Sequence, residues 1–164
     1  MSSKLLTIGS LCITGALVPL GATAQAGNIN TSGTICQNFN AAQALDIDYF
    51  TTAVRNVNAA ARPVVCSVPR SPLPTGTTPQ FFVDGHNNAS TCTTCTLTMY
   101  RFTGVIAATQ SFTQCAPATG ATTWDHLVSF PSLPGPDTFD YASLLCTLPA
   151  NGAGLLYGVT TAQP

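Results

Sequence analysis

The chain contains almost none of the residues that favour exposed helical surfaces. It has no glutamate, its single lysine is Lys4, and much of its polar content is threonine, serine, asparagine and glycine. Lysine and glutamate are good helix formers, whereas threonine suits the pleated surface of a sheet. Hydrophobic residues make up 45% of the chain, enough to bury a core, which argues against disorder. The composition therefore predicts an all-β domain.

Alternating apolar and polar residues, interrupted by turn residues, give the same prediction. Cys95, Leu97 and Met99 fall on one face of a strand, with threonines on the other. Gly104 is expected to turn the chain, as is the segment 149–152. Short strands at close intervals, with no long helix for a parallel crossover, predict an antiparallel β-sandwich-like domain. The expected strands are 64–68, 81–83, 95–103, 105–112, 124–130, 141–148 and 155–160, with mixed structure at 41–60.

The N-terminal segment has the pattern of a secretory signal peptide. Lys4 gives it a positive start, an uncharged stretch follows, and Ala24-Gln25-Ala26 forms an A-x-A cleavage site before Gly27. A membrane anchor is the alternative, but glycine and proline interrupt the stretch and no charged residue closes it. We expect residues 1–26 to be removed. Residues 27–164 then form one secreted domain, extracellular or periplasmic, with no stable membrane span.

Charge is sparse in the expected mature chain. Four arginines stand against six aspartates, a net charge of −2, and the charges are scattered. This distribution excludes the basic footprint of a nucleic-acid-binding protein and a basic membrane-binding patch.

Six cysteines remain after position 26, and an even number in a secreted domain predicts a disulfide framework. Six cysteines allow fifteen complete pairings, so the sequence does not determine the connectivity. With Gly104 as a hairpin turn, Cys92 comes near Cys115. Our preferred pairs are Cys92–Cys115, Cys95–Cys146 and Cys36–Cys66.

The segment Cys92-Thr93-Thr94-Cys95 has the spacing of a redox or zinc motif. A thioredoxin-type pair needs a helix N-terminus after it, and the residues that follow here favour a strand. A zinc site needs a second closely spaced pair of ligands, which the sequence lacks. We therefore interpret these cysteines as structural and expect no metal and no cofactor.

The segment 84–88 supplies the candidate ligand-binding residues. Asp84-Gly85 is a strong turn dipeptide, so we expect it to end the strand 81–83. Functional residues concentrate on loops. A plain turn, with Asp84 capping backbone N–H groups, explains the same residues. The candidates are Asp84, His86, Asn87 and Asn88, with the proline-rich loop 69–79 as a second binding loop.

Catalytic motifs are absent from the sequence. There is no G-x-S-x-G, H-E-x-x-H or P-loop pattern. A glycosidase pair of carboxyl groups would have to consist of aspartates, such as Asp46 and Asp48 on one strand face. Asp125 and His126 point to opposite faces of a strand, so we expect His126 to pack beside Trp124 rather than to pair with Asp125.

Three segments resemble parts of small exported bacterial proteins for which no activity is known. They are 64–70 (VVCSVPR), 82–85 (FVDG) and 141–149 (YASLLCTLP). The resemblance covers about half of the mature chain. It implies an exported β-domain and no particular chemistry.

These observations together favour a non-catalytic binding or structural module, secreted or in the cell envelope. A surface glycan or an envelope protein is the expected partner. A small secreted hydrolase that uses Asp84 with His86, or Asp46 with Asp48, is the alternative.

Overall fold

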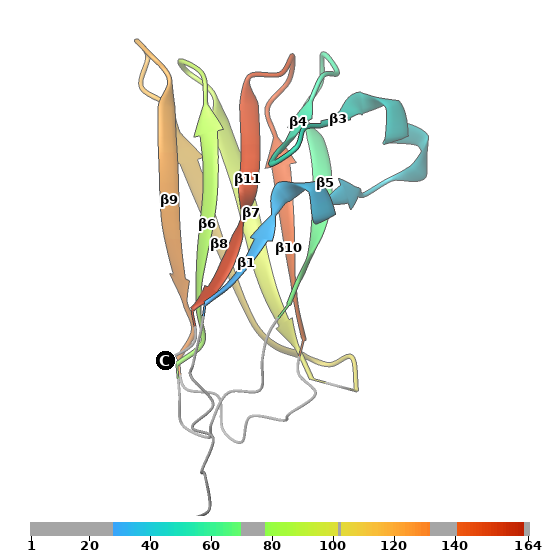
Figure 1. Cartoon of the computed structure of the whole chain (residues 1–164), viewed down its shortest axis with the longest axis vertical. Coiled ribbons are helices and arrows are strands. Elements are labelled where there is room, and N and C mark those ends of the chain that lie inside the picture. The colour runs from blue at the N-terminus through green and yellow to red at the C-terminus, as the bar shows by residue number, and fades with distance from the viewer. Residues whose placement is uncertain (1–27, 70–77, 102, 132–140, 163–164) are drawn as a thin grey trace, which may run out of the picture.

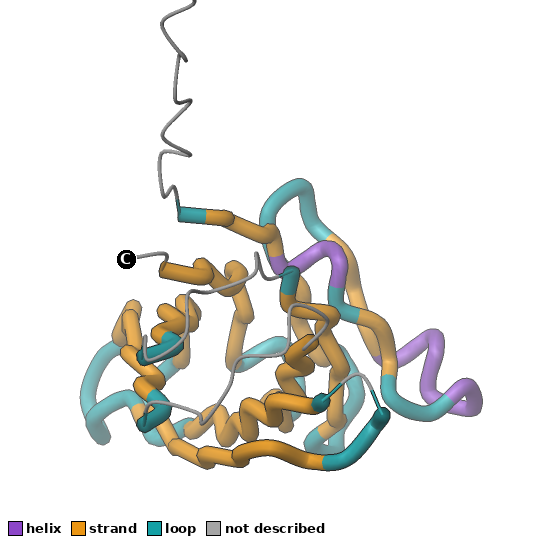
Figure 2. The backbone as a smooth tube through the Cα atoms, turned by 90° about the horizontal axis from the view of Figure 1, so that it is seen from below, coloured by secondary structure: helices purple, strands orange, loops and turns teal. Residues whose placement is uncertain are grey.

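A computed structural model describes residues 28–69, 78–101, 103–131 and 141–162. These residues form two antiparallel sheets that face each other, seen from the side in Figure 1 and along the strands in Figure 2. The predicted all-β, antiparallel sandwich-like fold is therefore confirmed. Within the described ranges, no helix is long and apolar enough to cross a membrane.

Sheet 1 has six strands. Its order is β3-β4-β11-β6-β9, and β1 also pairs with β11. The strands are β1 (Ile29–Ser32), β3 (Ile47–Tyr49), β4 (Val54–Asn56), β6 (Gln80–Asn87), β9 (Thr122–Ser129) and β11 (Gly154–Ala162).

Sheet 2 has five strands in the order β2-β5-β10-β7-β8. Two short 3₁₀ helices, η1 (Gly33–Ile35) and η2 (Ala41–Asp46), lie near the N-terminal end of the described chain. The strands of sheet 2 are β2 (Gln37–Asn38), β5 (Arg62–Val68), β7 (Cys92–Tyr100), β8 (Ile106–Cys115) and β10 (Tyr141–Leu148).

The core lies between the two sheets and follows the alternation in the sequence. Inward positions of β7 are buried, including Leu97 and Met99, while its outward threonines are exposed or half-buried. Phe81 and Val83 on β6 face them from sheet 1, together with Leu156 on β11, and all three are fully buried. Each large apolar side chain buried in this way contributes about 1.5–3 kcal/mol relative to an exposed position.

The predicted turns at Gly104 and in the segment 149–152 are confirmed. Gly104 has φ +81° and lies in the β7–β8 hairpin, where the Arg101 amide donates to the Val105 carbonyl over 2.9 Å. Asn151 and Gly152, with φ +56° and +70°, lie between β10 and β11. These left-handed conformations are ones that glycine and asparagine adopt at low cost.

All three preferred disulfides are confirmed. Cys92–Cys115 and Cys95–Cys146 join residues that lie directly opposite each other on paired strands. Cys36–Cys66 ties the N-terminal segment to β5, with a sequence separation of 30. Cys92 and Cys95 of the C-x-x-C segment therefore bond to different partners rather than to each other, which agrees with their interpretation as structural cysteines.

The predicted turn at Asp84-Gly85 is wrong. Strand β6 runs through both residues to Asn87, with β9 on one side and β11 on the other. Gly85 is buried, and a Cβ atom there would overlap the indole ring of Trp124. The glycine therefore permits close packing rather than a turn. The chain turns after β6, where Ser90 has φ +61°.

Candidate functional site

The four predicted ligand-binding residues do not form one site. On β6, Asp84 and His86 point away from the core and are half-buried, whereas Asn87 points inward and is fully buried. The Asn87 amide donates to the Gln114 carbonyl over 2.8 Å and accepts from the Thr93 hydroxyl over 2.7 Å, so it links the two sheets. Asn87 is thus a structural residue that a ligand outside the molecule cannot reach.

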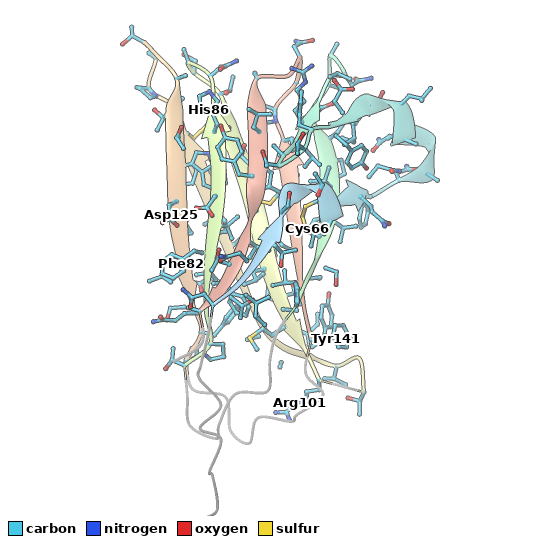
Figure 3. All side chains as sticks on the ribbon, in the orientation of Figure 1. Cys66, Phe82, His86, Arg101, Asp125 and Tyr141 are labelled. Carbon is cyan, nitrogen blue, oxygen red and sulfur yellow. A yellow bond between two sulfur atoms is a disulfide. The ribbon has the colours of Figure 1, made fainter. Side chains whose placement is uncertain are left out.

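His86 and Asn88 contact each other at one end of β6. The Nε2 atom of His86 lies 3.3 Å from Oδ1 of Asn88, and its Nδ1 atom lies 3.4 Å from the Thr123 hydroxyl. Figure 3 shows His86 towards one end of the β6–β9 pair, with Asp125 and Phe82 further along it. The partners of His86 are therefore Thr123 and Asn88 rather than Asp84.

Asp84 is paired across the strands with another carboxyl group. Its partner in the register is Asp125 on β9. Burial raises the pKa of Asp84, and so do the negative charge of Asp125 and a side-chain hydrogen bond with it. On the other side of Asp84, the register partner is Gly158 on β11, which has no side chain to cover the carboxyl group.

A groove lies beside Asp84 on the outer face of sheet 1, and we call it the β11 groove. The groove has two parts, and the larger one has a volume of about 430 Å³. Most of the residues that line it are polar, and Tyr157 is its one aromatic residue among the described ranges. Its residues are Asn30, Thr31 and Ser32 of β1, Thr52 of the β3–β4 turn, Asp84 of β6, and Tyr157, Gly158, Val159 and Thr160 of β11.

The pairing of β11 explains why a groove forms here. On one of its sides, β4 pairs with Leu155 and Leu156, and β1 pairs with the residues from Gly158 to Thr161. On the other side, the register with β6 shifts between Leu156 and Gly158, so Tyr157 is the extra residue of a β-bulge. Figure 1 shows β1 crossing beside the lower part of β11, below β4. The bulge thus lies between the two short strands.

Two glycines allow β1 and η1 to lie this close to β11. A Cβ atom on Gly33 would overlap the carbonyl oxygen of Leu156, and one on Gly158 would overlap the carbonyl oxygen of Thr31. Both positions therefore require glycine because of backbone contact. Together they set the distance between the two walls of the groove.

The second part of the β11 groove is more apolar and has a volume of about 370 Å³. It shares Thr52 and Tyr157 with the first part, and adds Phe50, Ala53, Arg55 and Leu155. The Arg55 guanidinium lies 4.6 Å from the centre of the Phe50 ring. It also donates to one Asp48 oxygen from Nε and Nη2, over 3.3 and 3.0 Å.

Asp46 and Asp48 are each held by an arginine. Arg62 pairs with Asp46 at 2.6 Å and Arg55 pairs with Asp48 at 3.0 Å. Hydrogen bonds from Arg62 and then Asn58 lower the pKa of Asp46. Each of the two aspartates therefore has an arginine as its ionic partner.

His126 is half-buried on the face opposite Asp125, as predicted, although the neighbour on which it packs is Phe112. Its ring stacks on Phe112 with the ring centres 4.0 Å apart, and Nδ1 lies 2.7 Å from Nε2 of Gln114. Asp125 points to the opposite, exposed face. The histidine therefore packs between β8 and β9.

Most of the groove was missed by the sequence analysis. Gly158 interrupts the apolar strand that ends the chain, and a glycine inside a strand often marks a bulge. That signal is the one from which Tyr157 could have been found. The contribution of β1 has no comparable signal. Most of the proline-rich loop, residues 70–77, lies outside the described residues.

Within the described ranges, no group of three or more histidine, cysteine, aspartate or glutamate side chains is arranged to hold a metal ion.

No protein-family model and no curated protein match the chain. Two solved structures are similar to it at low level. One is the Arthrobacter globiformis T6 isomalto-dextranase complexed with panose, with TM-score 0.36 and 16% identity, covering 66% of this chain and 18% of that one. The other is the Podospora anserina GH26-CBM35 β-(1,4)-mannanase, with TM-score 0.37 and 9% identity, covering 85% of this chain and 28% of that one. The chain thus spans a minor part of both proteins, and at these TM-scores neither one informs its function.

Proposed function

We propose that this protein is a non-catalytic secreted module that binds a glycan in the β11 groove. The observation that carries the proposal is the position of Tyr157, half-buried on the outer face of β11, beside polar residues of β1, β6 and β11 that line the same groove. A sugar ring offers both apolar C–H faces and many hydroxyl groups. A binding site for it needs an aromatic surface and several hydrogen-bonding groups together.

The arrangement of acids and bases favours binding over hydrolysis. Asp84 is the only carboxylate among the described residues that line the groove, and His86 is not among them. Asp125 hydrogen-bonds with Asp84. Glycosidases instead hold their two carboxyl groups about 5 Å or more apart, with the sugar between them. The pair formed here leaves no room for a sugar between the two groups.

The disulfides support secretion. Three of them cross-link sheet 2: two join its strands to each other, and the third ties the N-terminal segment to β5. Disulfides form and persist in oxidising compartments, outside the cell or in the periplasm. The signal-peptide pattern of residues 1–26 supports the same location.

Binding to a glycan array, followed by calorimetric titration of the glycans found, tests the proposal. Tyr157→Ala should weaken binding about tenfold or more, as loss of an aromatic anchor commonly does. Tyr141→Ala is the matched control, because Tyr141 is an exposed tyrosine on the outer face of sheet 2. It should bind as the unchanged protein does.

The same glycans, incubated with the protein, should be recovered intact. Release of shorter sugars that is lost in Asp84→Asn would show hydrolysis and overturn the non-catalytic assignment. Equal weakening by the two tyrosine variants would argue against the groove.

A further inference from the structure

The two parts of the β11 groove adjoin each other. They share Thr52 and Tyr157, so the Tyr157 ring forms a wall of both. Their volumes of about 430 and 370 Å³ each fall within the range of small-molecule sites, about 300–1,000 Å³. Each part can therefore hold a separate unit of one ligand.

The two parts differ in chemistry. Around Asp84 the walls are formed by the polar residues Asn30, Thr31 and Ser32 of β1. On the far side of Tyr157 the walls are the Phe50 ring and the Leu155 side chain. One part thus favours the polar edge of a bound unit, and the other favours an apolar face.

Charge restricts the ligand further. At the apolar end, Arg55 is already bonded to Asp48 and stacked on Phe50, so its charge is balanced within the protein. At the polar end, Asp84 lies against Asp125. The described walls of the groove therefore offer an anionic ligand no uncompensated positive charge, and their one carboxyl group, that of Asp84, has a second carboxyl group beside it.

We propose that the β11 groove binds a neutral glycan of at least two sugar units across Tyr157 and discriminates against acidic glycans. This inference rests on the proposed glycan-binding function. It adds the minimum length and the charge class of the ligand.

Calorimetric titration with glucose, cellobiose and cellotetraose, and with mannose, mannobiose and mannotetraose, tests the length. In the series that binds, affinity should rise about tenfold or more from one unit to two, because the second unit fills the other part of the groove. Phe50→Ala should reduce this rise, because Phe50 lines only one of the two parts that a longer glycan fills together. Leu127→Ala is the control, since Leu127 is an exposed apolar residue on the same sheet but outside the groove.

Titration with trigalacturonic acid tests the charge. At low salt it should bind about fivefold or more weakly than the neutral trisaccharide of the preferred series. Asp125→Asn should reduce this difference, because it removes charge beside Asp84 without changing a residue of the groove wall. Added salt should reduce it as well, since salt screens charges near the surface.

The outcomes separate the two proposals. If no sugar of either series binds, both the proposed function and this inference fail. If a single sugar binds as tightly as a tetrasaccharide, or trigalacturonic acid binds as tightly as the neutral chain, the inference fails and glycan binding stands. Binding of peptides in place of sugars would also overturn it.

Discussion

Asp84 and Asp125 lie directly opposite each other on the outer face of sheet 1, and each faces a like charge. Like charges directly opposite each other on neighbouring strands are destabilising. The two described ion pairs, Arg55–Asp48 and Arg62–Asp46, belong to other aspartates. The carboxyl pair is therefore a cost to folding, and its removal is measurable.

Asp84→Asn should raise the melting temperature at pH 7. The pKa of Asp84 is raised above 3.8 in the folded protein, so the folded state binds its proton more tightly than the unfolded state. Protonation of Asp84 therefore stabilises the folded state fully below pH 3.8, the ordinary pKa of the group. This stabilisation is lost as the pH rises through the raised pKa of the folded state. The gain from Asp84→Asn should thus be present at pH 7 and absent near pH 3.

The pKa of Asp46 is lowered, so its contribution has the opposite sign and is lost as the pH falls. Comparing Asp84→Asn with Asp46→Asn in melting curves at several pH values separates the two effects. If Asp84→Asn lowered the melting temperature at pH 7, the account of the carboxyl pair would be wrong.

Gly85→Ala should destabilise the fold by about 1–3 kcal/mol. The added methyl group would overlap the Trp124 ring in a buried position, and overpacking of a core costs this much. Gly104→Ala is the control, because no atom lies within 4 Å of a Cβ there. Its positive φ should cost about 1 kcal/mol. Urea denaturation measures both, and an equal cost would contradict the close packing at Gly85.

Asn87→Ala should cost about 2–3 kcal/mol, whereas Asn88→Ala should cost little. The first change leaves the buried Thr93 hydroxyl and Gln114 carbonyl without their partner, and each buried unsatisfied group costs about 1–3 kcal/mol. Asn88 is exposed. Denaturation with both variants tests this contrast, and a stable Asn87→Ala variant would show that the amide does not link the sheets.

Removal of the exposed disulfide with Cys92→Ala and Cys115→Ala should cost about 3 kcal/mol by the chain-entropy relation. The loop that it closes has a sequence separation of 23, against 51 for Cys95–Cys146. Removing the buried disulfide Cys95–Cys146 in the same way should cost at least about 4 kcal/mol. Its longer loop gives a larger entropy contribution, and the shortened side chains leave cavities in the core. Melting temperatures of the two double variants give the order, and a reversed order would contradict this account.

The sequence predicted most of the fold because alternation and turn residues act locally. Strand β10 has the bounds expected for it, and the hairpin at Gly104 placed Cys92 opposite Cys115. At Asp84-Gly85 the local preference for a turn is overridden by pairing on both sides of β6 and by packing of Trp124 on Gly85. A dipeptide carries no information about either contact.

The groove could not be predicted in the same way. Its walls come from β1 and β11, whose residues Thr31 and Val159 pair from opposite ends of the described chain. The bulge at Tyr157 is a register shift between β11 and β6, next to the place where β4 ends and β1 begins along β11. The sequence supplied single groups such as Asp84, and only the tertiary pairing shows which other groups lie beside them.

Titration of the ¹⁵N-labelled protein with cellotetraose and with mannotetraose, followed by amide NMR, tests the central claim most directly. The account predicts that one of them shifts the amide signals of β1, Thr52 and the segment 157–160, and leaves those around Tyr100 and Tyr141 on sheet 2 unchanged. Shifts confined to sheet 2, or no shift with either sugar, would contradict glycan binding in the β11 groove.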